Sequence, residues 1–223
     1  MWPARAFNHS NSNNNTYLEN QLYDNNNTPI GNALKQKTEG SSTNTLTVIQ
    51  MDYSNPINKD NKIESGLRSQ IRNFSSSNYN YYEQSGQYIT NDLLNSNYKF
   101  TDQVYAAYIT YTAKKGNFGY NIGLRAESSN YDGTQIKKVD SSFKVNYPIS
   151  LFPSAFLSYK INDKQDVQLN YTRRINRPNF FQLLPFYNYT DPLNLSVGNA
   201  GLKPEFTNSL EANYSYQINN GNS

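Results

Sequence analysis

The chain has 223 residues, and only 36% of them belong to the apolar set AVILMFWYC, although 20 are tyrosine and 11 are phenylalanine. A mean hydropathy of −0.83 leaves a soluble domain short of apolar area, whereas an aromatic content of 14% is too high for a disordered chain. The absence of cysteine excludes disulfides and thiolate metal sites, and a net charge of +3 is too weak to indicate nucleic-acid binding.

The first part of the chain, residues 1–44, is rich in asparagine and shows no regular pattern, so we expect a loop or a ragged start there. Residues 1–7 lack the charged start and apolar block of a signal peptide, and we therefore expect an export signal to lie upstream. Since no run of about 18 apolar residues occurs, the sequence predicts no membrane-spanning helix.

Residues 45–218 alternate apolar and polar side chains, which is typical of strands with one apolar face. The pattern predicts about seven antiparallel strands, each long enough for a tilted membrane crossing of about 9–11 residues. The apolar residues that mark them fall in these segments: 49–53, 63–71, 102–113, 118–127, 151–161, 166–172 and 207–218. The fold class predicted is thus all-β, an up-and-down segment of a larger transmembrane barrel, followed by a turn at 219–223.

The predicted connections alternate between short and long. Short turns are expected at 55–61, 114–117 and 162–165, and long loops at about 75–101, 131–147 and 178–206. Strict alternation places all short turns on one side of the sheet, as in outer-membrane barrels, where periplasmic turns are short and extracellular loops are long. Seven strands cannot close such a wall, so we expect the isolated chain to be unable to insert as a monomer.

Aromatic residues near the short turns and the chain end share the apolar parity of their strands. They are Tyr53, Tyr111, Phe118, Tyr120, Tyr159 and Tyr216. Aromatic rings favour the membrane–water boundary, so these residues predict a lipid-facing girdle on the periplasmic side. The alternative is ordinary cross-strand tyrosine pairing in a soluble sheet.

A succession of weak motifs carries a resemblance to a known family over about residues 45–218. In chain order the motifs are Asp52-Tyr53 with Pro56, Gly66-Leu67-Arg68, Tyr105-Ala106-Ala107-Tyr108, Gly123-Leu124-Arg125-Ala126-Glu127, Leu151-Phe152-Pro153-Ser154, Tyr171-Thr172-Arg173-Arg174-Ile175-Asn176-Arg177-Pro178, Leu184-Pro185-Phe186, Asp191-Pro192, Gly198-Asn199 and Leu202-Lys203-Pro204-Glu205. This succession resembles the barrel of Bacteroidetes TonB-dependent receptors, the outer-membrane protein β-barrel family.

That resemblance implies a barrel of about 22 strands in the outer membrane of a Gram-negative, Bacteroidetes-like cell, plugged by an N-terminal domain. The implied partners are membrane lipid, the plug and remaining strands outside this sequence, TonB acting through the plug, and a possible surface lipoprotein. The implied function is uptake of a siderophore, glycan or peptide. The alternative is a surface-binding or adhesion barrel without active transport.

Three arginines are candidate ligand-binding or lumen residues: Arg173, Arg174 and Arg177 lie where a strand enters the segment 179–206. They could attract an anionic substrate. The alternative is a structural network in which they pair with Glu127, Glu211 or plug carboxylates. Segment 179–206 itself could contact ligand as an outer loop or cap the barrel rim.

A second candidate group is Tyr79, Tyr81 and Tyr82, in a predicted outer loop where tyrosine and asparagine could bind a sugar or peptide. The alternative is a generic tyrosine-rich loop. His9 is the sole histidine and has no carboxylate cluster beside it, so no metal, cofactor or catalytic site is expected, and the chain is expected not to be an enzyme. A soluble carbohydrate-active sandwich is disfavoured because the pattern offers no paired catalytic carboxylates.

Overall fold

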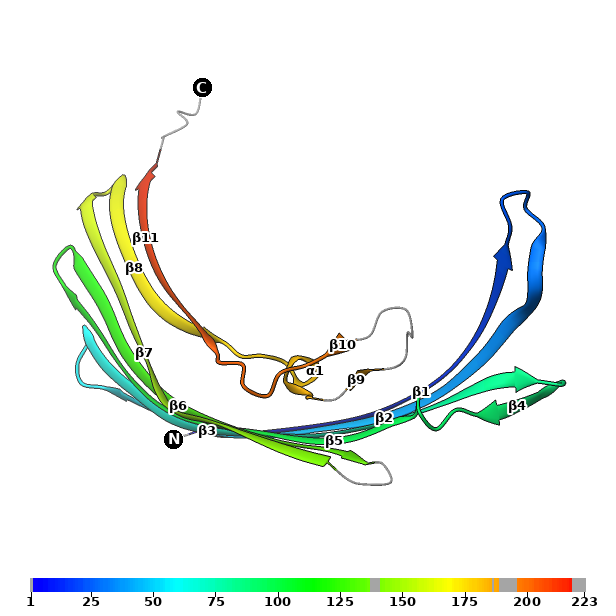
Figure 1. Ribbon diagram of the computed structural model, residues 1–223. Helices are drawn as coiled ribbons and strands as arrows, with labels where there is room; N and C mark the ends of the chain where they lie inside the picture. The colour runs from blue at the N-terminus through cyan, green and yellow to red at the C-terminus, as the bar shows by residue number, and fades with distance from the viewer. Residues whose placement is uncertain (1, 137–140, 186, 189–195, 218–223) are drawn as a thin grey trace.

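The computed structural model describes residues 2–136, 141–185, 187–188 and 196–217, and nearly all of them lie in one antiparallel sheet that curves into an open trough (Figure 1). The sheet has nine strands in the order β1-β2-β3-β5-β6-β7-β8-β11, with β4 paired to β3. The predicted all-β, up-and-down architecture is confirmed. No helix among these residues is long and apolar enough to cross a membrane.

The strands of the main sheet are β1 (Trp2–Tyr23), β2 (Pro29–Pro56), β3 (Asn61–Gln84), β4 (Gln87–Thr90), β5 (Ser96–Lys115), β6 (Phe118–Ile136), β7 (Ser141–Asn162), β8 (Gln165–Asn176) and β11 (Glu205–Tyr216). A short helix, α1 (Phe180–Leu183), and a small two-stranded sheet of β9 (Tyr187–Asn188) and β10 (Ser196–Val197) lie between β8 and β11.

Strand pairing places the alternating apolar residues on one face. Tyr111 lies opposite Ile63 on β3 and opposite Ile122 on β6, and the same register continues into β7 and β8. Directly paired residues share a face, so these side chains all project from the convex side. We call the exposed members of this set the outer apolar band: Ile49, Met51, Tyr53, Leu67, Tyr105, Ile109, Phe118, Ile122, Leu124, Leu151, Tyr159, Val167, Leu169, Leu210, Tyr214 and Tyr216.

The aromatic residues predicted as a girdle all have convex-face positions. Tyr120 links two of its neighbours, since its ring centroid lies 5.9 Å from that of Tyr111 and 5.9 Å from that of Phe118. Tyr53 and Tyr159 are exposed at the same end of the sheet. Large exposed rings beside the turns match the arrangement expected at a membrane–water boundary.

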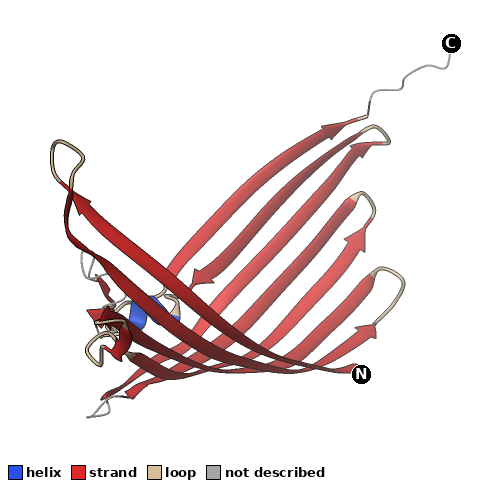
Figure 2. Ribbon diagram, turned by 90° about the vertical axis from the view of Figure 1, so that its right-hand side faces the viewer, coloured by secondary structure: helices blue, strands red, loops and turns tan. Residues whose placement is uncertain are grey.

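The three predicted short turns are confirmed at residues 57–60, 116–117 and 163–164, and Figure 2 shows them at one end of the sheet. At the other end the prediction of long loops at 75–101 and 131–147 is wrong. β3 continues to Gln84 and β6 to Ile136, while β5 begins at Ser96 and β7 at Ser141.

The first 44 residues also differ from the prediction. Residues 8–44, expected to be a loop, form most of β1 and the beginning of β2, joined by a tight turn at 24–28. Eight strands therefore follow one another along the main path, one more than expected. The predicted terminal turn at 219–223 lies outside the described residues.

These corrections have one physical cause. β2 has 28 residues and, at about 3.3 Å per residue, is far longer than a membrane crossing of about 9–11 residues. Above Ile49 its convex-face residues are Thr47, Thr45 and Thr43, which are polar. The main-chain hydrogen bonds between strands do not require an apolar face. The strands therefore extend into water, past the point where apolar and polar side chains stop alternating.

Candidate functional site on the concave face

The segment that follows β8 turns back into the trough, so that α1 lies inside the curve of the sheet (Figure 1). Asn179 caps this helix: its side chain accepts from the Gln182 backbone N–H, and the Gln182 side chain accepts from the Asn179 N–H. This reciprocal capping satisfies two amide donors that a helix start leaves free, which explains why so short a helix forms.

The returning chain is hydrogen-bonded to the helix through Gly198. Its N–H donates to the Leu184 carbonyl at 2.8 Å, and the Asn199 N–H donates to the Gln182 carbonyl at 2.7 Å. A Cβ at Gly198 would lie 2.6 Å from the carbonyl oxygens of Phe181, Gln182 and Leu184. Only glycine permits this approach, so the glycine fixes the fold of the segment.

Apolar side chains attach this segment to the wall. The wall contributes Tyr98, Phe100, Tyr131, Phe143 and Tyr147, and the segment contributes Phe180, Leu183 and Leu184. Leu183 is fully buried, and the Phe180 ring centroid lies 4.6 Å from that of Phe100. In addition, the Tyr147 hydroxyl donates to the Leu202 carbonyl at 3.0 Å. The buried core of the described chain therefore lies on the concave face.

Charged residues line the same face just below this cluster. Arg177, which begins the returning segment, pairs with Glu127 of β6 and donates from Nε to the Ser129 hydroxyl at 3.1 Å. Arg125 also contacts Glu127, at 2.7 Å. We call Arg125, Glu127 and Arg177 the concave ion network; because Glu127 is buried, its charge depends on both guanidiniums.

A second ion pair joins Arg72 of β3 to Asp102 of β5 at 3.0 Å. Asp102 lies beyond the outer apolar band and is buried, with its Oδ1 atom without a hydrogen-bond partner among the described residues. Burial raises the pKa of the Asp102 carboxyl, while Arg72 and Arg177 oppose that rise. The guanidinium of Arg72 is about half exposed and retains donors that face the trough.

These groups surround a pocket between the wall and the returning segment. Its volume is about 550 Å³, and its lining includes Arg72, Phe74, Asp102, Tyr131, Arg177 and Phe180. A second pocket of about 600 Å³ lies on the other side of the helix and is lined by Tyr98, Phe181, Gln182 and Asn199 among others. Both volumes are in the range of small-molecule sites; polar and apolar groups line the first pocket in similar amounts, and the second pocket is mainly apolar.

The three predicted arginines have different environments. Arg177 makes the contact with Glu127 that the structural alternative expected. Arg173 stacks on the Phe206 ring, with its guanidinium carbon 4.7 Å from the ring centroid. Arg174 is exposed, and its pairing register places it on the concave side with Thr172. Their role in ligand binding stays a prediction.

The three predicted tyrosines lie in β3 rather than in a loop, and they do not face one common site. Tyr79 and Tyr81 share the convex parity of Leu67, while Tyr82 has the opposite parity. The Tyr81 hydroxyl donates to Glu39 at 3.2 Å, and the Lys37 ammonium lies 5.7 Å from its ring centroid. This group lies outside the membrane-crossing part of the sheet.

The described residues contain no group of three or more histidine, aspartate or glutamate side chains that could hold a metal ion. His9 is hydrogen-bonded to the Thr45 hydroxyl at 2.9 Å. The sequence reasoning missed Arg72 and Asp102. They are 30 residues apart in the chain but directly opposite across β3 and β5, and only the strand register could have brought them together.

Comparison with solved structures found partial likenesses to two receptors and a transporter. The ferric yersiniabactin uptake receptor FyuA from Yersinia pestis shares 15% identity at a TM-score of 0.47, over 96% of this chain and 31% of that one. The ferric citrate transporter FecA shares 15% identity at a TM-score of 0.42, over 77% and 25%. The siderophore receptor PirA from Pseudomonas aeruginosa shares 13% at 0.32, over 97% and 52%. At such TM-scores and identities these likenesses carry no functional conclusion.

This chain spans about a quarter to a half of the length of those structures. No curated protein matches the sequence. A family model, in contrast, matches residues 4–223, which is nearly the whole chain including the strands β1 and β2 that the sequence pattern did not reveal. With its convex apolar band and its polar concave face, the chain belongs to the Outer membrane protein beta-barrel family and is a protein of the outer membrane.

Proposed function

We propose that this chain forms part of the wall of a TonB-dependent receptor of the Bacteroidetes type that takes up a nutrient such as a siderophore, a glycan or a peptide. The motif succession from Asp52 to Glu205 supports the receptor type. The family match supports the barrel and its membrane.

The observation that carries the proposal is the returning segment on the concave face. A wall that only separated lipid from water would need no folded segment inside it. Here the segment is held by a buried aromatic cluster and by the concave ion network, and it narrows the trough beside pockets of ligand size. The exposed guanidiniums of Arg72 and Arg174 would attract an anionic or hydroxyl-rich solute passing this point.

The remaining parts of the receptor belong to the same proposal. The outer edges of β1 and β11 have no strand partner among the described residues, and unpaired main-chain groups in lipid are costly. Further strands, to a total of about 22, would close the wall. A plug domain would fill it, TonB would act through that plug, and a surface lipoprotein could deliver the ligand.

Uptake by cells tests the proposal. In a strain whose own gene is deleted, the wild-type protein should restore energy-dependent uptake of one ligand class. Arg174→Ala should reduce uptake several-fold while the amount of folded protein in the outer membrane stays the same. Arg72→Gln should reduce uptake as well, and because it leaves the buried Asp102 without its ion-pair partner, its uptake is compared per amount of folded protein. Lys99→Gln, which removes one positive charge from the convex side, is the matched control. Normal uptake by both arginine variants would contradict a ligand-contacting role.

A second candidate function, surface binding without transport, rests on the tyrosines of β3. Tyr79 and Tyr81 face outward from the barrel beyond the membrane, where they cannot contact a solute in the lumen but could contact a partner on the cell surface. Tyr79→Ala with Tyr81→Ala should then weaken cell adhesion and leave uptake unchanged. Energy-independent ligand binding by cells, with no accumulation inside, would favour this second function over the first.

A further inference from the structure

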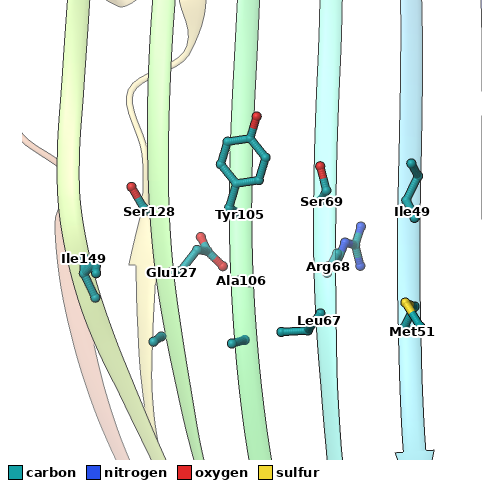
Figure 3. Close-up of a pocket in the computed structure, with 12 residues that line it drawn as sticks. Ile49, Met51, Leu67, Arg68, Ser69, Tyr105, Ala106, Glu127, Ser128 and Ile149 are labelled. Atoms are coloured by element: carbon teal, nitrogen blue, oxygen red, sulfur yellow. The ribbon is translucent and has the colours of Figure 1, made fainter. Parts of the chain in front are cut away.

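The outer apolar band contains a hollow at its upper edge, away from the short turns. The hollow has a volume of about 460 Å³ and is formed on four neighbouring strands with Ile149 of β7 at its side. Figure 3 shows Ile49, Ser69, Tyr105 and Ser128 at one level of the sheet, with Met51 and Leu67 at the next level. The lining surface is almost entirely apolar.

Small side chains between large ones create this hollow. Ala107 lies directly opposite Ala126 on β6 and opposite Leu67 on β3, so two short side chains meet between the larger Leu67, Tyr105 and Ile149. Leu67 and Ile149 at its sides are strongly exposed. A hollow of this shape would remain dry beneath lipid, and apolar chains are its natural occupants.

A positive charge lies beside the hollow on the same face. Arg5 of β1 is paired with Ile49 of β2, in the same row as Tyr105, and it is exposed with no ion pair among the described residues. The row above is mixed, with Thr47 and Gln103 beside Phe7 and Ile71. The row beyond it contains only polar side chains, among them His9, Thr45, Asn73 and Thr101, and marks the change from apolar to polar. The long arginine side chain can extend along the apolar face toward these polar rows, where a lipid phosphate would accept its hydrogen bonds.

We infer that this hollow is a binding site for a phosphate-bearing lipid of the membrane leaflet opposite the short turns. One acyl chain lies between Leu67, Ala107 and Ala126, and the headgroup phosphate accepts hydrogen bonds from Arg5. The site is independent of the proposed transport function, because its occupant lies on the convex face, although Glu127 of the concave ion network also borders the hollow.

The test uses the protein purified from outer membranes in detergent and titrated, in native mass spectrometry, with phosphatidylglycerol or with neutral phosphatidylcholine. The wild-type protein should retain one phosphatidylglycerol in preference to phosphatidylcholine. Filling the hollow with Ala107→Leu and Ala126→Leu should weaken that binding by about tenfold or more. Arg5→Gln should remove the preference for the anionic lipid while retaining weak binding of both lipids.

Matched controls make the result specific. Ala155→Leu makes one such Ala→Leu change on the convex face outside the hollow, and Lys99→Gln removes one convex-face charge farther from it. Both should bind phosphatidylglycerol as the wild type does. If the filled variant binds like the wild type, or if Ala155→Leu loses binding equally, the lipid is only part of a general annulus and the inference is wrong.

Discussion

Single residues on the concave face show how burial decides which charges matter. Arg174 and Arg177 are three positions apart at the end of β8, yet one is exposed and the other pairs with a buried glutamate. A charge in water is stabilised by solvent, whereas Glu127 depends on its protein partners. The number of arginines in the sequence therefore does not indicate which of them stabilise the structure.

This difference predicts unequal effects of the same substitution. Arg177→Met should lower the free energy of unfolding by about 2 kcal/mol, because Glu127 and Ser129 lose a charged donor. Arg174→Met should change it by less than about 0.5 kcal/mol, as expected for an exposed position. Urea titration of the protein in detergent micelles, followed by circular dichroism, measures both. Equal losses in the two variants would contradict the conclusion that Arg177 stabilises the fold and Arg174 does not.

Among the elements, the returning segment depends most on tertiary contacts. A helix of four residues is too short to persist alone, so its stability comes from capping by Asn179 and from burial of Phe180 and Leu183 against the wall. The side chain of Phe181, in contrast, is exposed toward the trough. The element therefore has one face for attachment and one face available to solutes.

Substitutions on the two faces of α1 should separate these roles. Leu183→Ala should destabilise the packed segment by about 3 kcal/mol, since it leaves a cavity at a fully buried position of the described core. Limited proteolysis of the detergent-solubilised protein should then cut between residues 177 and 206 while the strands stay intact. Phe181→Ala should leave the cleavage pattern unchanged. Resistance of the Leu183→Ala protein to protease would show that the segment does not rely on this contact.

At the scale of the whole molecule, the two faces of the sheet meet different solvents. The convex face is apolar only over the height of a membrane, and the concave face is polar with one buried cluster. Charge on the lipid side is costly near the middle of the bilayer, whereas charge on the lumen side is hydrated. Neighbouring residues in one strand should therefore lose unequal amounts of stability on the same substitution.

Ile109 and Thr110 of β5 provide that comparison, because they are adjacent in sequence and project from opposite faces. Ile109→Arg should reduce the folding free energy in lipid vesicles by about 2–4 kcal/mol, and Thr110→Arg by less than about 1 kcal/mol. Reversible folding into vesicles across a denaturant series measures the difference. A larger loss for Thr110→Arg would mean that Thr110, and not Ile109, faces the lipid.

The sequence by itself determined which side chains share a face and how tall the lipid-facing band is. Alternation along 118–127 is a local property of one strand, and it correctly placed Tyr120 and Ile122 on the convex side. The short turns could be predicted for the same reason, since Gly116 and its polar neighbours interrupt the alternation locally.

The tertiary structure alone decided how far the strands extend, where the segment after β8 lies and which charges meet. Strands beyond the membrane pair through their main chains, so residues 8–44 leave no side-chain pattern to read. Arg72 and Asp102, and likewise Arg177 and Glu127, are brought together by strand register and by a chain reversal. Such contacts join residues that are far apart in the sequence, and a local periodicity of side chains does not specify them.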